Sequence, residues 1–176
     1  MARLGHFLFG IFSALSLFGV HAAPADAKIS VGDIVNALKL NLVTHINATI
    51  TLESLTTNLI SINFDVKNSL PIELTIDRVV SKAGINGTVF ATFDHTFTKP
   101  VVVPLLGTAN SGTINNVLLT QGALASLDII PLGFLDLIST DVFVRAFTIF
   151  GMLGIPIPVT GIKQSHVPTA YNLALS

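Results

Sequence analysis

A period-two alternation of apolar and polar residues between positions 58 and 104 constrains the fold of this chain more than any other feature. Every second residue is apolar from 60 to 66 and again from 72 to 77. Residues 88–98 place Val, Ala and Phe on one face and mostly Thr and Asp on the other. Because successive side chains of a strand point to opposite faces, the pattern predicts three half-buried strands. An antiparallel meander with one solvated face is typical of such a pattern.

Two turn sequences separate these strands. Residues 68–71 read Asn-Ser-Leu-Pro, and a proline can open a strand but cannot lie inside a central one. Residues 84–87 read Gly-Ile-Asn-Gly, which supplies two positions that tolerate a positive φ. The first turn breaks the chain before the second strand, and the second turn breaks it before the third.

Further strands are expected on both sides of this segment. Residues 40–52 alternate with one slip at Val43 and Thr44, which predicts a long strand containing a β-bulge. Residues 113–119 predict another strand. Residues 141–150 are apolar on both faces, so that strand should be central or covered, and its Arg145 should pair with a carboxylate or reach water.

The ends of the chain give weaker signals. Residues 155–162 predict a last strand, and Pro156 and Pro158 remove two N–H groups from the same lateral edge, so we expect an edge strand. The tail from Gln164 is expected to be frayed. Near the other end, residues 31–38 could form a short helix with Ser30 as its N-cap.

Four short motifs of the central segment carry a family resemblance. They are Asn-x-Leu-Pro-Ile-x-Leu at 68–74, Ile-Asp-Arg-Val at 76–79, Ile-Asn-Gly-Thr at 85–88 and Val-Val-Val-Pro at 101–104. They resemble the late embryogenesis abundant type-two family, also called the water-stress and hypersensitive-response domain. Ser69 stands where that family often has proline. Outside the central segment, the resemblance lies only in the general pattern.

The resemblance implies an immunoglobulin-like or fibronectin-like fold and no catalytic residues. Together with the alternation, it predicts an all-β protein: an antiparallel β-sandwich of about seven or eight strands with a short helical connection. The predicted domain spans residues 23–176, with its core at 40–166.

Residues 1–22 predict a secretory signal peptide. Arg3 supplies the positive charge, residues 4–20 form the apolar run, and Val20-His21-Ala22 places small residues where cleavage requires them. Residues 25–27 offer a second cleavage site. We therefore expect a secreted, extracellular protein, and the alternative is an uncleaved N-terminal membrane anchor.

Composition excludes several classes of protein. None of the 176 residues is cysteine, which excludes disulfides, thiolate metal sites and a cysteine nucleophile. The formal net charge is −1 and no basic run exists, so we expect no nucleic-acid partner. A hydrophobic fraction of 51% with only 11% charged residues indicates a large core.

Two glycosylation sequons agree with a secretory route. They begin at Asn47, on the polar face of a predicted strand, and at Asn86, in the predicted Gly-Ile-Asn-Gly turn. Both asparagines are expected to be exposed, and they are the predicted glycosylation sites.

No catalytic, cofactor or metal site emerges from the sequence. His45, His95 and His166 have no spacing that requires a metal. The sequence contains no Gly-x-Ser-x-Gly nucleophile motif and no glycine-rich phosphate loop. We therefore predict no enzymatic activity and no cofactor.

Residues 123–138 form the most apolar stretch after the signal, and Pro131 and Gly133 divide it. One interpretation is one or two short helical turns that plug an end of the sandwich. The other is an exposed apolar lip that meets a lipid or a protein partner. The residues of that surface would be Leu124, Leu127, Ile130, Leu132, Phe134 and Leu135.

The predicted function is non-enzymatic. By resemblance, it is a structural or protective role in stress response, acting through the protein's surface on a membrane or a protein client. A module that binds a lipid or another apolar small molecule is the first alternative, and a secreted hydrolase is the second. The oligomeric state is left open.

Overall fold

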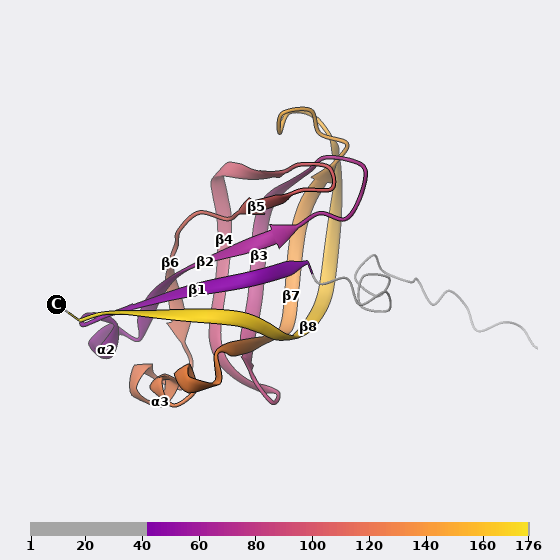
Figure 1. The fold of residues 1–176 in the computed structure, drawn as a ribbon. Helices are drawn as coiled ribbons and strands as arrows, with labels where there is room; N and C mark the ends of the chain where they lie inside the picture. The colour runs from indigo at the N-terminus through magenta and orange to yellow at the C-terminus, as the bar shows by residue number, and fades with distance from the viewer. Residues whose placement is uncertain (1–41, 176) are drawn as a thin grey trace, which may run out of the picture.

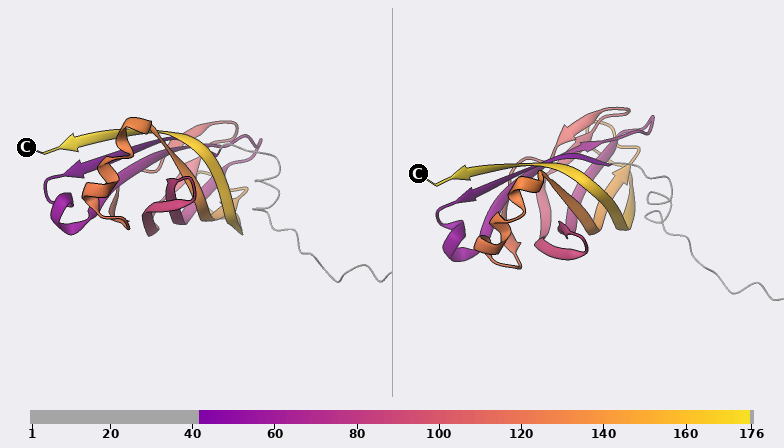
Figure 2. Two further views of the ribbon diagram at one scale, coloured as in Figure 1. Left: turned by 90° about the horizontal axis from the view of Figure 1, so that it is seen from below. Right: turned by 60° about the horizontal axis from the view of Figure 1, so that its bottom comes forward.

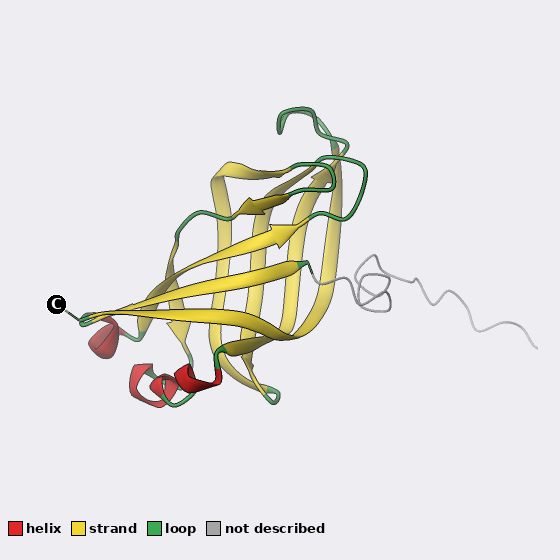
Figure 3. Ribbon diagram, in the orientation of Figure 1, coloured by secondary structure: helices red, strands yellow, loops and turns green. Residues whose placement is uncertain are grey.

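The computed structural model describes residues 42–175, and strands dominate this part of the chain (Figures 1 and 3). The strands of the described part are β1 (Val43–Thr51), β2 (Leu59–Lys67), β3 (Leu74–Ile85), β4 (Thr88–Val103), β5 (Thr108–Asn110), β6 (Ile114–Leu119), β7 (Phe134–Ala146) and β8 (Ile155–Ala174). Its helical turns are α2 (Ser54–Thr57), α3 (Ala123–Leu127) and the 3-10 turn η1 (Ile130–Leu132). The predicted signal peptide and the helix at 31–38 lie outside the described residues.

The strands close into a β-barrel, so the predicted immunoglobulin-like or fibronectin-like sandwich is wrong. Within the described residues the order is β1-β8-β7-β3-β4-β6-β2, and β2 pairs back with β1 to complete a ring of seven strands. The short β5 lies beyond β6 on the same edge of β2. A sandwich leaves sheet edges unpaired, whereas this ring joins its first and last strands.

Strand β8 makes the closure possible, and the prediction that the chain is frayed from Gln164 is also wrong. The strand pairs antiparallel with β7 as far as Pro168, and Thr169 to Ala174 then pair in parallel with β1. Pro156 and Pro158 lie in the part that pairs with β7 alone. The expectation of a free edge is therefore correct for that part of the strand and wrong for its second half.

The predicted alternation is confirmed in β2 and β3, but the meander is not. Strands β2 and β3 turn their predicted apolar residues inward, yet β2 pairs with β1, β5 and β6, whereas β3 pairs with β4 and β7. Periodicity identifies the face of a strand but not its neighbour. The predicted bulge in the first strand is present as a register shift between Val43 and His45.

The connections between the strands lie at the two ends of the barrel. The loop end carries the start of β1 and the connections 68–73, 104–107 and 147–154. The capped end carries α2, α3, η1, the β3–β4 turn and the end of β8 (Figure 2). One or two helical turns were predicted for residues 123–138, and two are present there as α3 and η1.

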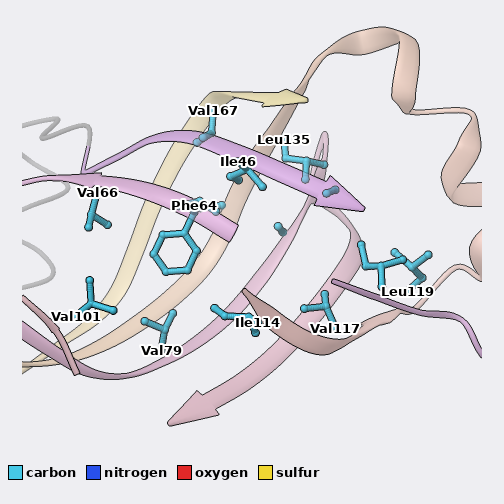
Figure 4. Close-up of a cluster of buried hydrophobic side chains, with 14 of the residues drawn as sticks. Ile46, Phe64, Val66, Val79, Val101, Ile114, Val117, Leu119, Leu135 and Val167 are labelled. Carbon is cyan, nitrogen blue, oxygen red and sulfur yellow. The ribbon is translucent and has the colours of Figure 1, made fainter. Parts of the chain in front are cut away.

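The core occupies the inside of the barrel. Figure 4 shows Ile46, Phe64, Val79 and Val117, from four different strands, pointing into a shared interior. Val167 of β8 joins them and is fully buried. Because each strand contributes alternate residues to the interior, the hydrophobic effect holds the ring together from within.

Removing methyl groups at Val167 should therefore destabilise the whole fold. We expect Val167→Ala to lower the free energy of unfolding by about 1–3 kcal/mol, because it leaves a cavity in the core. Leu175→Ala, at an exposed position beyond the end of β8, should change it by less than about 0.5 kcal/mol. Urea unfolding measures both, and equal small effects would show that the C-terminal strand is not part of the core.

Candidate ligand cavity

The barrel encloses a cavity of about 290 Å³. All seven strands of the ring contribute to its wall, and most of the contributing side chains are aliphatic or aromatic. The volume is near the lower limit of roughly 300 Å³ for small-molecule sites and well above the roughly 150 Å³ at which an apolar cavity holds benzene. The space therefore suits an apolar molecule of on the order of a dozen non-hydrogen atoms.

Most polar groups in the wall are already satisfied by the protein. The Ser81 and Thr140 hydroxyls lie 2.8 Å apart and form a hydrogen bond with each other, and the Ser126 hydroxyl donates to the Gly122 carbonyl at 2.7 Å. Gln164 forms hydrogen bonds to the backbone of Val43 through both its amide oxygen and its amide nitrogen. These groups offer little to a ligand, because their hydrogen-bonding capacity is used within the wall.

Tyr171 is the exception. Its side chain lines the cavity, and its hydroxyl is shielded from solvent without a hydrogen-bond partner in residues 42–175. Burial raises the pKa of Tyr171 to about 12, so the hydroxyl stays neutral at physiological pH. A buried polar group without a partner is costly in a folded protein. The Tyr171 hydroxyl therefore has unused hydrogen-bonding capacity beside the cavity.

The cavity is covered at one end and reaches the surface at the other. Ser126 and Ile129, from the segment of α3 and η1, line it at the capped end. At the loop end its wall includes Leu70 and Phe147, which are both exposed, and the exposed Lys67. The helical segment thus serves as a plug, and the loop end is the side from which a ligand can enter.

Asn68 holds two of the loops at this open end together. It is buried, and its side-chain nitrogen donates to the carbonyls of Ile72 at 2.6 Å and Pro104 at 3.0 Å. Its side-chain oxygen accepts from the backbone N–H of Leu70. The residue that the sequence marked as a turn former therefore fixes the loops 68–73 and 104–107 to each other.

Arg145 and Glu73 hold the third loop, 147–154. The Arg145 guanidinium forms an ion pair with Asp77 at 2.9 Å, as the sequence led us to expect, and it donates to the carbonyls of Gly151 and Leu153. The hydrogen bond to Asp77 raises the pKa of Arg145. The backbone N–H of Gly151 donates to the Glu73 carboxylate at 2.9 Å and lowers the pKa of Glu73.

The six residues proposed as an apolar lip do not form one surface. Leu135 is buried and lines the cavity, whereas Phe134 lies outside and stacks on His166 with ring centroids 4.4 Å apart. Leu124 and Leu132 are exposed at the capped end, and Leu127 and Ile130 are half-buried against the core. A continuous lip is absent because α3, η1 and the start of β7 turn their side chains in different directions.

The two sequon asparagines differ in accessibility. Asn86 is exposed in the β3–β4 turn, with a φ of 49°. Asn47 is half-buried on β1, where its amide donates to Asn63 at 2.9 Å and its side-chain oxygen lies 3.1 Å from a ring nitrogen of His45. Glycosylation at either position stays a prediction, and the geometry favours Asn86.

The three histidines of the described residues make separate contacts, and His45 lies 3.1 Å from the side-chain oxygen of Asn47. His95 stacks edge-on against Phe97, and exposed His166 lies on Phe134. Between residues 42 and 175, no group of three or more His, Asp or Glu side chains is placed to hold a metal ion. None of the helices in this same range is long and apolar enough to cross a membrane.

Sequence reasoning did not identify Tyr171 as a residue of the cavity wall. The residue lies in the tail that was expected to be frayed, and its partner strand β1 is more than a hundred positions away in the sequence. The one available signal for this residue was that Tyr171 is the single tyrosine of a chain without tryptophan.

Comparison with known proteins adds little. No family model matches this chain, and no curated protein matches it. A solved structure, described as the crystal structure of a protein from Archaeoglobus fulgidus, is similar at 13% identity and a TM-score of 0.30, covering 67% of this chain and 91% of that one. A similarity of this size supports no functional inference. Membership of the late embryogenesis abundant type-two family stays a prediction.

The alkaline titration of Tyr171 tests the burial of its hydroxyl. In the unfolded chain the phenol should ionise near pH 10, and in the folded protein near pH 12. The unfolded state therefore binds fewer protons between these values, so stability should be fully present below pH 10 and fall as pH rises toward 12.

Ultraviolet absorbance of tyrosinate measures this directly, because Tyr171 is the only tyrosine of the chain. Thermal unfolding of the native protein and of Tyr171→Phe over the same pH range is the matched measurement. A midpoint near 10 for the folded protein would show that the hydroxyl is in contact with water.

Proposed function

We propose that this protein binds an apolar small molecule inside its barrel. The observation that carries the proposal is the apolar cavity of about 290 Å³, whose wall includes Tyr171, a residue with a buried and unpartnered hydroxyl. The apolar wall supplies affinity through burial of ligand surface, and the buried, unpartnered hydroxyl of Tyr171 supplies orientation. The ligand class is therefore a hydrophobic molecule with one neutral hydroxyl or carbonyl group.

The composition of the wall favours binding over catalysis. The titratable side chains that line the cavity are Lys67, at its open end, and Tyr171. General acid–base or nucleophilic catalysis requires a base within hydrogen-bond reach of the reacting group. The Ser81 and Thr140 hydroxyls face only each other, and the lining contains neither a histidine nor a carboxylate to activate them.

Binding of a lipid or another apolar small molecule was the first alternative function predicted from the sequence. The present proposal ranks it above the protective role. The protective role rests on a family resemblance whose implied sandwich is not the observed fold. The signal peptide predicted at residues 1–22 would direct the binding protein out of the cell, and we expect it to hold its ligand in an extracellular setting.

A matched pair of fluorescent probes tests the proposal. Naphthalene and 2-naphthol differ by one hydroxyl, and we expect both to bind with one molecule per chain. The hydroxyl should strengthen binding by roughly fivefold, corresponding to about 1 kcal/mol, because it provides a partner for Tyr171. Fluorescence titration of the two probes measures both affinities.

Two variants separate the roles of the wall and the hydroxyl. Tyr171→Phe should remove the preference for 2-naphthol and leave naphthalene binding intact. Ala83→Leu, which places a larger side chain in the wall, should weaken both probes about equally. Failure of both probes to bind the native protein would contradict the proposal, and so would a preference that Tyr171→Phe leaves unchanged.

A further inference from the structure

Beyond ligand binding, we propose that the loop end of the barrel is a surface that inserts into a lipid bilayer. Its central element is the β7–β8 connection at residues 147–154, which projects past the neighbouring loops in Figure 1. We name this connection the apolar tip. The inference concerns a partner and a surface other than the interior cavity.

The apolar tip exposes large hydrophobic side chains. Phe150 is 90% exposed and Leu153 is 79% exposed, and Phe147, Ile149 and Met152 are exposed as well. Residues 146–155 contain no charged side chain, and their one polar residue, Thr148, is buried. Monomeric soluble proteins rarely expose such a concentration of apolar surface without a partner for it.

Hydrogen bonds from residues in and next to the adjoining barrel strands hold the apolar tip in this arrangement. Thr148 accepts a hydrogen bond from the buried Thr75 hydroxyl at 2.9 Å, and Arg145 and Glu73 bind its backbone. The polar groups therefore face the barrel, and the apolar side chains face out. This is the reverse of the arrangement that ordinary collapse onto a core would produce.

The backbone of the tip is strained in the same place. Phe147, Phe150 and Leu153 have φ values of 59°, 51° and 60°, in the left-handed region that bulky side chains rarely adopt. Leu106, on the neighbouring loop 104–107, has a φ of 51° and is also exposed. Strain at several exposed apolar residues at one end of a molecule indicates a functional surface.

Three features indicate a bilayer rather than a rigid protein partner. The first is shape, because a projecting loop can enter fluid hydrocarbon without a complementary groove. The second is the backbone: Ile149 and Met152 exchange two hydrogen bonds, and Arg145 satisfies the carbonyls of Gly151 and Leu153. These hydrogen bonds lower the cost of moving that part of the loop backbone into an apolar phase.

The third feature is position. Phe147 belongs both to the tip and to the wall of the cavity, and Leu70 lines the open end of that cavity. An apolar ligand could therefore pass between a bilayer and the barrel without crossing water.

The absence of cysteine allows a site-specific test on the full chain. An environment-sensitive fluorophore is attached to Met152→Cys in the tip, and to Leu124→Cys at the capped end, where Leu124 is 71% exposed. Each labelled protein is mixed with vesicles of neutral phosphatidylcholine, with and without lipids that carry a quencher in their acyl chains. This local readout does not depend on whether residues 4–20 also bind the vesicle.

We expect the label at position 152 to shift its emission to the blue and to be quenched by the acyl-chain quencher, at low and at high salt alike. The label at position 124 should do neither. Adding Leu153→Asp to the Met152→Cys protein should weaken insertion of the label by at least about tenfold, because it places a charge in the bilayer. Leu124→Asp, its matched control, should leave insertion unchanged.

Phe150→Asn is a second test variant that should keep the protein folded, because asparagine tolerates the left-handed conformation of position 150. It should weaken insertion while leaving the unfolding midpoint unchanged or higher. Equal responses at positions 124 and 152, or none at either, would overturn the inference. A response at 152 that depends on protein concentration without vesicles would also overturn it, because the tip would then bind a second copy of the chain.

Ligand binding provides an independent control. Titration of 2-naphthol without vesicles tests the proposed function alone, and Tyr171→Phe should change that titration without changing insertion of the tip. The two proposals can therefore fail separately.

Discussion

The parallel pairing of β1 with β8 is the interaction on which the rest of the structure depends. It joins the first and last strands of the described chain and turns an open sheet into a ring. Without it, the apolar faces of the strands would need a second sheet to cover them. With it, they cover one another and enclose a cavity, and Tyr171 lies in the segment of β8 that makes the pairing. Closure and the candidate binding site are consequences of the same contact.

Closure also separates the molecule into two chemically different ends. The capped end is plugged by the helical segment after β6, where Leu124 and Leu132 are the exposed apolar residues of that segment. The loop end carries strained, exposed hydrophobic residues above a layer of polar groups that includes Arg145, Asp77 and Glu73. The two proposals use different surfaces of the barrel: the cavity wall binds the ligand, and the exposed side chains of the loop end contact the bilayer. Phe147 belongs to both surfaces.

Local features of the sequence predicted much of the fold. Alternation located the inward faces of β2 and β3, and the slip near Val43 predicted the bulge. The apolar character of residues 141–150 predicted that Arg145 would pair with a carboxylate or reach water, and it pairs with Asp77. What could not be predicted was which strands pair. Pairing depends on contacts far apart in sequence, and a period-two pattern is the same in a sandwich and in a barrel. The site was missed for the same reason, because Tyr171 acquires its surroundings only through the strand it pairs with.

The most direct test of the account is nuclear magnetic resonance detection of contacts between bound 2-naphthol and the protein. Nuclear Overhauser effects should connect the probe to interior methyl groups such as those of Val79 and Val117, and to the ring of Tyr171. This result would place the ligand inside the closed barrel. Contacts confined to exposed residues such as Leu124 or Leu153, with none to the interior, would contradict the claim that the barrel interior is a binding site.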